Sequence, residues 1–591
     1  MDRKSREKRG PLHKPIQNEL IEIEECLIKL LTKRGRLLAK ARQLGPRSGQ
    51  ARQEVDLDKR LWQLWESRAP KDAADVKLWR TFFTLLQELT PKGQDRLNEH
   101  LGHSFGQRAA TTIAETDDKS PRSFLLTPRQ DPTELYILGP GCLTQTRLFT
   151  ILAAQAKQPA HVAGIIVNDP LVELIKALNQ VGGNLYWDAS SIKGRGVQEL
   201  DFDNKVIYCG NDPLNAYLLL ALAITKPIRC KIAGGPGVHT LDLAAFRRLA
   251  PHLGGRLAGV APGAPSLPIR LEASAVPADA IPLPDDLPPL AAMAIAVAAP
   301  AYIGGLSLRW SSHGPYAAAI EAALGLAAKT LEQCGVPLIH GPGFMNIDAS
   351  VPALPVQPIM TLDPWISAAL LALPRLHKPG RPGGKSHILG LWPTDLAVWQ
   401  EADRLLTAVG LTLVVDSKGA CTTVAKNPAV TCPHILDAAI YPEGLPLAVV
   451  LAAAMTLANQ EPAILLAKIT EQDRAVAGEL LERVNLILAP AQTPGLSNEI
   501  WTVVRNNTLT QNEPIPWPSP TSFWTIAYAL IAHLQPGLRL LNPGSMTELL
   551  PKFWTLFNSL PKAPHDILFQ QRRAPEEQRC SEHPKRRRIR T

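Results

Sequence analysis

The chain has 591 residues, and its 45% hydrophobic and 20% charged content is that of an ordinary globular protein. Its formal net charge of +9 is concentrated at the two ends. Residues 1–15 hold six Lys or Arg against two acids, and residues 565–591 hold eight against four. The body between them is nearly neutral, so we expect no basic face for nucleic acid. The length allows two or three domains, each with its own core.

The cysteine and hydropathy patterns exclude further classes of protein. Eight cysteines are scattered with no C-x-x-C pair, which is typical of reduced thiols in a cytoplasmic protein. The histidines show no metal-ligand spacing, so we expect neither a metal nor a cofactor. No apolar run has the length and setting of a signal peptide or a membrane span. The sequence therefore predicts a cytoplasmic protein outside the membrane.

The first part of the chain predicts three helices. Residues 15–44 place leucine and isoleucine along one stripe at helical spacing, and residues 54–68 and 75–99 add two segments rich in Trp and Phe. Such helices form a small all-α bundle or half of a dimeric one, so the chain could dimerise here. The expected organisation is a basic flexible N-terminus (1–14), a helical domain (15–102), a polar linker (103–133), a main body (134–561) and a basic flexible tail (562–591).

A repeated unit fills the main body. An alanine-rich apolar segment recurs six times, with neighbouring copies roughly 70–80 residues apart. These segments are Leu148–Ala156, Ala216–Thr225, Pro289–Ala301, Trp365–Leu373, Pro446–Ala458 and Phe523–Leu534.

A more polar amphipathic helix is expected after each apolar segment. The second set is Leu171–Val181, Leu241–Leu253, Tyr316–Cys334, Leu396–Val409, Asp473–Val484 and Glu548–Leu560. Most of these are followed by a glycine and an extended apolar run, a pattern typical of a helix end and a strand. The sequence thus predicts an α/β (α+β) fold of six strand–helix–strand–helix–strand–strand repeats.

The opening of the first repeat resembles a known family. Leu138 is followed by Gly-Pro-Gly-Cys-Leu-Thr-Gln-Thr, then by Arg147 and an alanine-rich helix. This resembles the start of the enolpyruvyl transferases, in particular 3-phosphoshikimate 1-carboxyvinyltransferase (EPSP synthase). The resemblance implies a two-lobed inside-out barrel with three repeats per lobe and an active site in the cleft between the lobes.

Further patches extend the resemblance and suggest site residues. Thr470 to Arg474 resembles the family's Lys-Glu-Thr-Asp-Arg motif, which implies that Glu471 is a catalytic acid or base and that Arg474 binds the phosphoenolpyruvate carboxylate. Arg147 would bind the shikimate carboxylate. The other implied substrate-binding residues are Thr144 in the opening turn, Gly210 and Asn211 at a phosphoenolpyruvate turn, Tyr316 on the shikimate side, and Asp363 before a small-residue helix.

The resemblance implies a reaction and leaves other functions open. The implied activity transfers the carboxyvinyl group of phosphoenolpyruvate to shikimate 3-phosphate, in the biosynthesis of chorismate and aromatic amino acids. The family's Pro-Asp-Ala-Ala element, whose Asp is catalytic, falls on Pro446-Leu447-Ala448-Val449, and several family Lys and Arg positions hold other residues. A catalytically degenerate relative that acts as a binding or regulatory partner is therefore the alternative. Transfer to a less anionic acceptor is a third possibility.

The N-terminal helices have a weaker resemblance of their own. The segment from Ile16 to Ala39 is similar to the first helix of AroQ-type chorismate mutases, and Arg34 matches that helix's central arginine. The resemblance implies a dicarboxylate-binding role for Arg34, although the family's earlier arginine falls on Gln17. We expect little or no chorismate mutase activity.

Overall fold

The computed structural model describes residues 123–196, 199–260, 266–314, 316–376, 384–425, 433–491, 499–506 and 516–569. The expected helical domain at 15–102, with Arg34, lies outside these residues, as do the basic N-terminus and most of the basic tail. The described part is a mixed α/β structure with several small sheets and 13 α-helices. None of its helices combines the length and the apolar character needed to span a membrane.

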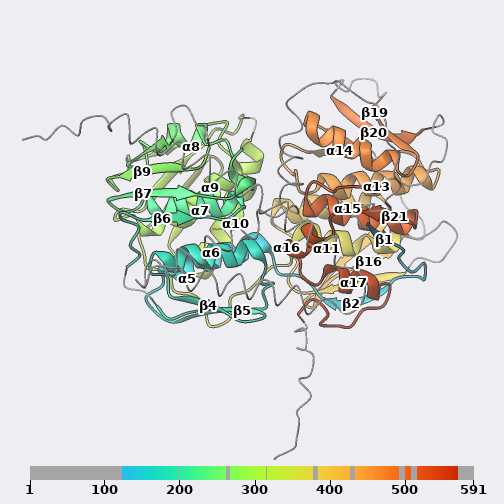
Figure 1. Ribbon diagram of the computed structural model, residues 1–591, viewed down its shortest axis with the longest axis horizontal. Helices are drawn as coiled ribbons and strands as arrows, with labels where there is room; N and C mark the ends of the chain where they lie inside the picture. Colours follow the sequence, from blue (N-terminus) through green and yellow to red (C-terminus); the bar gives the residue numbers. More distant parts are fainter. Residues whose placement is uncertain are drawn as a thin grey trace, which may run out of the picture. The chain divides into compact units, whose positions relative to one another are not determined.

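The elements form two lobes (Figure 1). We call residues 142–358 the N-lobe, and residues 363–569 together with the two strands β1 and β2 the C-lobe. The N-lobe helices are α5 (Leu143–Gln155), α6 (Asp169–Gln180), α7 (Pro213–Ala223), α8 (Ala244–Leu249), α9 (Pro289–Ala298) and α10 (Ala317–Gln333). The C-lobe helices are α11 (Pro364–Leu371), α12 (Ala397–Ala408), α13 (Leu445–Leu457), α14 (Glu471–Glu482), α15 (Ser522–Leu534), α16 (Gly544–Leu549) and α17 (Phe553–Ser559). Three 3₁₀ turns are η1 (Pro236–Val238), η2 (Ala299–Ala301) and η3 (Leu373–Arg375).

The described residues of the N-lobe form three sheets. Their strands are β3 (Ala160–Ala163), β4 (Leu185–Trp187), β5 (Ser191–Gly194), β6 (Val206–Tyr208), β7 (Ile228–Ala233), β8 (Gly255–Gly259), β9 (Ile269–Ala273), β10 (Ile281–Pro282), β11 (Leu306–Arg309), β12 (Leu338–Gly341) and β13 (Phe344–Ile347). The orders are β3-β5-β4, β6-β7-β9-β8 and β10-β11-β13-β12. In both four-stranded sheets the first pair is parallel and the other pairs are antiparallel.

The C-lobe repeats this arrangement. Its strands are β1 (Phe124–Leu126), β2 (Glu134–Leu138), β14 (Lys385–Leu389), β15 (Leu411–Val415), β16 (Gly419–Val424), β17 (His434–Asp437), β18 (Ile464–Ala467), β19 (Leu486–Pro490), β20 (Ile500–Arg505) and β21 (Leu538–Leu540). The orders are β15-β16-β14-β2, β17-β18-β20-β19 and β1-β21. Strand β2 precedes the N-lobe in the chain but pairs in parallel with β14, so the described part of the chain starts in the C-lobe, forms the N-lobe and returns. Strand β1 lies in the stretch expected to be a linker, so the described fold begins before residue 134.

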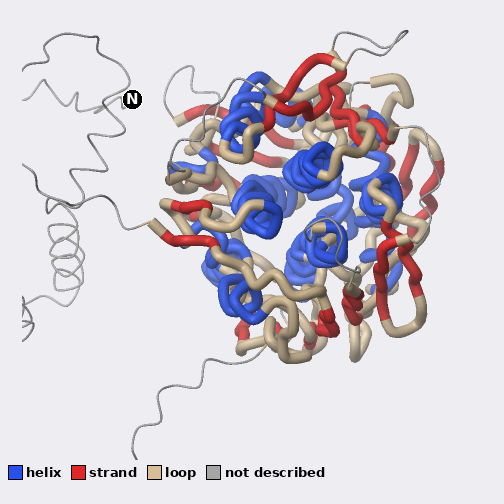
Figure 2. The backbone as a smooth tube through the Cα atoms, turned by 90° about the vertical axis from the view of Figure 1, so that its right-hand side faces the viewer, coloured by secondary structure: helices blue, strands red, loops and turns tan. Residues whose placement is uncertain are grey.

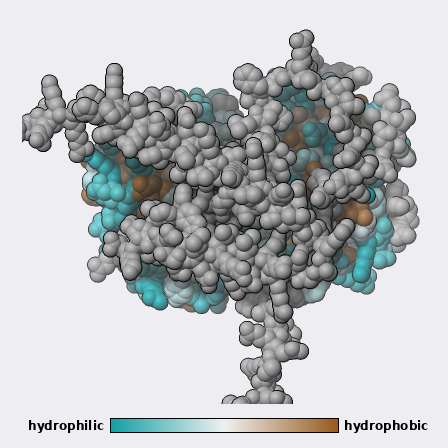
Figure 3. All heavy atoms as spheres, in the orientation of Figure 1, coloured by the Kyte–Doolittle hydropathy of each residue, from teal (hydrophilic) through white to brown (hydrophobic). Residues whose placement is uncertain are grey.

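All six apolar segments expected from the sequence are helical, as α5, α7, α9, α11, α13 and α15. Nearly every side chain of α7 and α13 is buried, which explains why their alanine and leucine positions show no polar face. Figure 2 shows helices gathered inside, with strands nearer the outside. Hydrophilic side chains occupy much of the described surface visible at the margins of Figure 3.

The more polar helices agree less closely with the expected ranges. Helix α8 covers only Ala244–Leu249 of the expected 241–253. The last expected helix, 548–560, is two helices, since α16 ends at Leu549 and α17 begins at Phe553. Pro551 lies between them, and proline cannot donate the backbone hydrogen bond that would continue a helix.

Two chain segments cross between the lobes side by side. Residues 139–142 lead from β2 into α5, and residues 360–363 lead back into α11. They form an isolated bridge between Gly141 and Leu362, and Cys142 N donates to Thr361 O at 2.7 Å. Gly139 allows the close approach, because a Cβ there would lie 2.3 Å from a Leu362 side-chain carbon.

Asp363 joins the two crossing segments. Its carboxylate accepts the backbone N–H of Ile366 at 3.1 Å, which caps α11, and that of Leu143 at 3.3 Å, at the start of α5. One buried side chain therefore holds helix starts in both lobes.

We predict that Asp363→Ala lowers the free energy of unfolding by about 1–3 kcal/mol, because two buried N–H groups lose their acceptor. Denaturant unfolding of the full chain measures this. Asp348→Ala, at an exposed position, is the control and should change the value by less than about 0.5 kcal/mol. An unchanged stability in Asp363→Ala would contradict the structural role.

Candidate functional site

Arg147 is the central cation of the candidate site. It lies in the second turn of α5, is largely buried, and donates from Nε to Leu143 O at 3.3 Å. Its guanidinium forms an ion pair with the carboxylate of Asp212. Asp212 also caps α7, accepting the N–H of Asn215 at 3.1 Å. The guanidinium that the resemblance assigns to a substrate carboxylate is therefore paired with a carboxylate of the protein, that of Asp212.

The positive charge of Arg147 also affects two carboxyl groups of the C-lobe. Asp363 follows the returning segment, and Glu443 lies two residues before α13. Burial raises the pKa of Asp363, while its backbone hydrogen bonds and the charge of Arg147 act in the opposite direction. We call Arg147, Asp212, Asp363 and Glu443 the carboxylate cluster.

Glu443 is the member of the cluster best suited to hold a proton near neutral pH. Burial and the charge of Asp363 raise its pKa and the charge of Arg147 lowers it, and the resulting pKa is about 7. The side chain lines a narrow apolar gap with Trp365 and Leu447, which explains the desolvation. The residue as a whole is exposed, so its carboxyl can exchange protons with solvent.

The expected turn at Gly210 and Asn211 lies close to the cluster and carries an acid of its own. Gly210 has a φ of 79°, and Asn211 N donates to a carboxylate oxygen of Glu173 at 3.2 Å. A Cβ at Gly210 would overlap this carboxylate, so the turn and Glu173 fit closely. Partial burial raises the pKa of Glu173, and the charge of Asp212 adds to the effect. The backbone donor expected to bind phosphoenolpyruvate therefore binds a carboxylate of the chain.

Glu471 and Arg474 lie at the start of α14, as expected from the sequence. Thr470 caps this helix, and Arg474 pairs with Glu471 at 2.6 Å. The Glu471 side chain is 87% exposed, and the Arg474 guanidinium lies 4.9 Å from the Trp501 ring centre. These contacts are those of a helix N-terminus with a local ion pair. A role for Glu471 in catalysis stays a prediction.

The two remaining expected residues lie at helix starts in the N-lobe. Thr144 is half-buried in the first turn of α5, beside the Asp363 contact. Tyr316 is half-buried immediately before α10. Among the described residues, no three His, Cys, Asp or Glu side chains lie close enough to hold a metal ion.

Solved structures share this fold. No protein-family model and no curated protein matches the sequence. The described region has the fold of the enolpyruvyl transferases, at low sequence identity. In particular it resembles EPSP synthase.

The TM-score, sequence identity and coverage of these matches define how far the resemblance extends. An EPSP synthase from Acinetobacter baumannii matches with a TM-score of 0.57 and 11% identity, over 74% of this chain and 98% of that one. The enolpyruvyl transferase NikO from Streptomyces tendae matches with a TM-score of 0.52 and 15% identity, over 71% of this chain and 93% of that one. At such identities the likeness establishes the fold and not the substrates.

Sequence reasoning missed three acids of the site: Asp212, Glu443 and Glu173. Asp212 and Glu443 could have been noticed, because each lies just before an alanine-rich or leucine-rich helix. Glu443 follows Pro442, so a Pro-acid pair does precede α13, four residues before the Pro446-Leu447 pair that aligns with the family's Pro-Asp. Glu173 gives no such signal, because its contact with Asn211 spans 38 residues.

Asp212→Asn tests whether Asp212 neutralises Arg147. Asparagine caps a helix as well as aspartate, so α7 is retained while the negative charge is removed. We predict that the variant binds inorganic phosphate at least about threefold more tightly than the wild type, because the guanidinium is freed. Calorimetric titration measures this, with Asp348→Asn as a control of equal charge change. Unchanged or weaker binding would show that the pair does not limit anion affinity.

Proposed function

We propose that this chain transfers the carboxyvinyl group of phosphoenolpyruvate to the 5-hydroxyl of shikimate 3-phosphate. The strongest support is that Glu443, whose pKa its surroundings raise to about 7, lies near enough to Arg147 for the guanidinium charge to lower that pKa, in an enolpyruvyl transferase fold. The proposal places the chain in the cytoplasm, in chorismate and aromatic amino acid biosynthesis. No cofactor is needed, because proton transfer and anion binding suffice for the reaction.

The chemistry assigns separate roles to the two groups. Protonated Glu443 gives its proton to the methylene carbon of phosphoenolpyruvate as the acceptor hydroxyl attacks the adjacent carbon, and the hydroxyl proton passes to an oxygen of the phosphate group that leaves. The Glu443 carboxylate then takes back a proton from the new methyl group, and inorganic phosphate leaves with its bonding electron pair. Arg147 holds a substrate carboxylate during these steps. Positioning the two reactants supplies much of the gain in such a bimolecular reaction.

The remaining residues from the resemblance belong to the same proposal. Glu471 is the alternative proton-transfer group, and Arg474 the alternative carboxylate ligand. The other proposed substrate-binding residues are Thr144, Gly210, Asn211, Tyr316 and Asp363. For the N-terminal region, the chorismate-mutase-like role of Arg34 and a dimer contact are proposals of the same kind.

The finer architecture is also part of the proposal. We infer six strand–helix–strand–helix–strand–strand repeats arranged as a two-lobed inside-out barrel. The support is that four of the sheets share one strand order and one pattern of parallel and antiparallel pairs. The inner position of the apolar helices is consistent with such a barrel (Figure 2).

A binding or regulatory protein without catalysis is the second candidate. It is favoured by the charge balance of the carboxylate cluster, where Arg147 faces Asp212, Asp363 and Glu443. Two substrates that each carry a phosphate and a carboxylate would have to compete with these acids. Phosphate release in the presence of both substrates distinguishes an enzyme from a binding partner.

We predict that Glu443→Gln reduces kcat for phosphate release by about 100-fold or more, because general acid catalysis contributes that much. Since the protonated form donates, wild-type kcat should fall as the pH rises through about 7, and this decline should be absent in the variant. Glu471→Gln is the matched comparison and should retain most of the activity. The opposite ranking of the two variants would assign proton transfer to Glu471 instead.

A further inference from the structure

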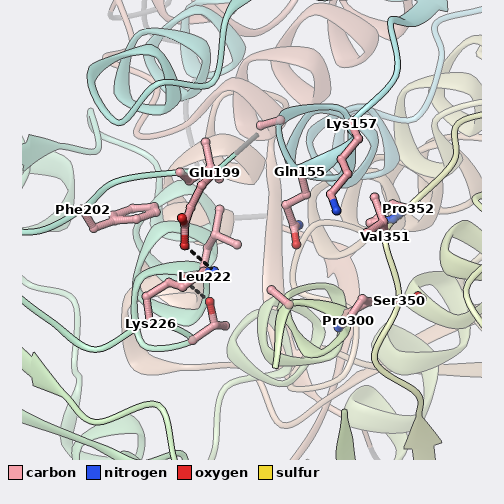
Figure 4. Close-up of a pocket in the computed structure, with 14 residues that line it drawn as sticks. Gln155, Lys157, Glu199, Phe202, Leu222, Lys226, Pro300, Ser350, Val351 and Pro352 are labelled. Atoms are coloured by element: carbon pink, nitrogen blue, oxygen red, sulfur yellow. Dashed lines mark hydrogen bonds and ion pairs between the residues drawn. The ribbon is translucent and has the colours of Figure 1, made fainter. Parts of the chain in front are cut away.

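A second pocket lies at the other ends of the N-lobe helices. It has a volume of about 370 Å³, within the range of small-molecule sites. Its lining includes Gln155 at the end of α5, Thr225 just after α7, and Pro300 in η2 after α9 (Figure 4). Gln155 lies eight residues beyond Arg147 on α5, which is about 12 Å along the helix axis. The pocket is therefore separate from the carboxylate cluster.

Charged side chains lie on two sides of this pocket: Lys157 on one, and the pair of Glu199 and Lys226 on the other. Lys157 extends into the pocket beside Gln155, and it forms no hydrogen bond or ion pair with any residue that the structure describes. Across the pocket, Glu199 and Lys226 form an ion pair at 2.9 Å (Figure 4). The C-terminal ends of α5 and α7 add partial negative charge, which favours a cationic group.

The rest of the wall combines the polar side chains of Gln155, Thr225 and Ser350 with aliphatic groups. Leu200, Leu222, Pro300, Val351 and Pro352 contribute aliphatic surface between the charged groups. A ligand can therefore place a carboxylate at Lys157, an ammonium group at the helix ends, where it shares Glu199 with Lys226, and an aliphatic part beside the apolar residues.

We propose that this pocket binds a free α-amino acid with an aliphatic side chain. The zwitterion satisfies both signs of charge, whereas a simple anion or a simple amine satisfies only one. Because α5 and α7 carry Arg147 and Asp212 near their other ends, a ligand here contacts the same two helices that build the carboxylate cluster. The inference does not depend on the proposed reaction, since binding can be measured without turnover.

In the test, the full-length protein is titrated with leucine, and binding is detected by saturation-transfer NMR of the ligand. We expect saturable binding with a Kd of about 1 mM or lower. Two probes each lack one charge: 4-methylpentanoate has no ammonium group and isopentylamine has no carboxylate. Each should bind at least about tenfold more weakly than leucine, because a charge-assisted contact is lost.

Two variants with the same change of charge locate the site. Lys157→Gln should weaken leucine binding at least about tenfold. Lys176→Gln, at an exposed position of α6 that does not line the pocket, should leave it unchanged. Both lysines are exposed, so circular dichroism and thermal unfolding should match the wild type. The proposal is overturned by an absence of saturable leucine binding, by equal binding of either single-charge probe, or by wild-type affinity in Lys157→Gln.

Discussion

The ion pair between Arg147 and Asp212 is the interaction around which the candidate site is arranged. A buried guanidinium is stable only if nearby groups neutralise it and accept its hydrogen bonds. Asp212 meets this need and at the same time caps α7, whose N-terminal end favours a negative charge. Asp363 and Glu443 then approach from the C-lobe, so one cation relates carboxyl groups of both lobes.

This arrangement changes what the fold can bind. A helix N-terminus with free N–H groups attracts anions, but here the Asn211 N–H already binds Glu173 and the α7 cap is Asp212. An incoming phosphate or carboxylate must compete with these acids or be held by other cations. Asp212, together with burial and the charge of Asp363, also raises the pKa of Glu443, so the cluster that weakens anion binding also supplies a proton donor near neutral pH.

Much of the fold could be predicted from the sequence, because the inner helices are buried on all sides. Burial of that kind demands alanine and leucine at nearly every position, as in α13, and the resulting segments recur at a visible period. The bounds of the outer helices are harder to predict from the sequence, because their polar faces resemble loops and a residue such as Pro551 can divide them. Helices α16 and α17 are the clearest example.

The site could be predicted only in part, because its contacts are long-range. Arg147 was identified from the local pattern around it, but its partner Asp212 lies 65 residues away and no local pattern joins them. Glu443 gives a weaker signal, because the family's Pro-Asp element aligns with Pro446 and Leu447, four residues further along the chain. A carboxyl group acquires an unusual pKa from its three-dimensional surroundings, which the sequence around it does not specify.

The most direct test of this account is the pKa of Glu443, measured from side-chain carboxyl ¹³C shifts and assigned by comparison with Glu443→Gln. The account predicts a value of about 7 in the wild type. In Arg147→Met the value should rise further, because the neighbouring positive charge is removed. An ordinary value close to 4.5 that does not respond to Arg147→Met would contradict the account, because it would place Glu443 outside the influence of the cluster.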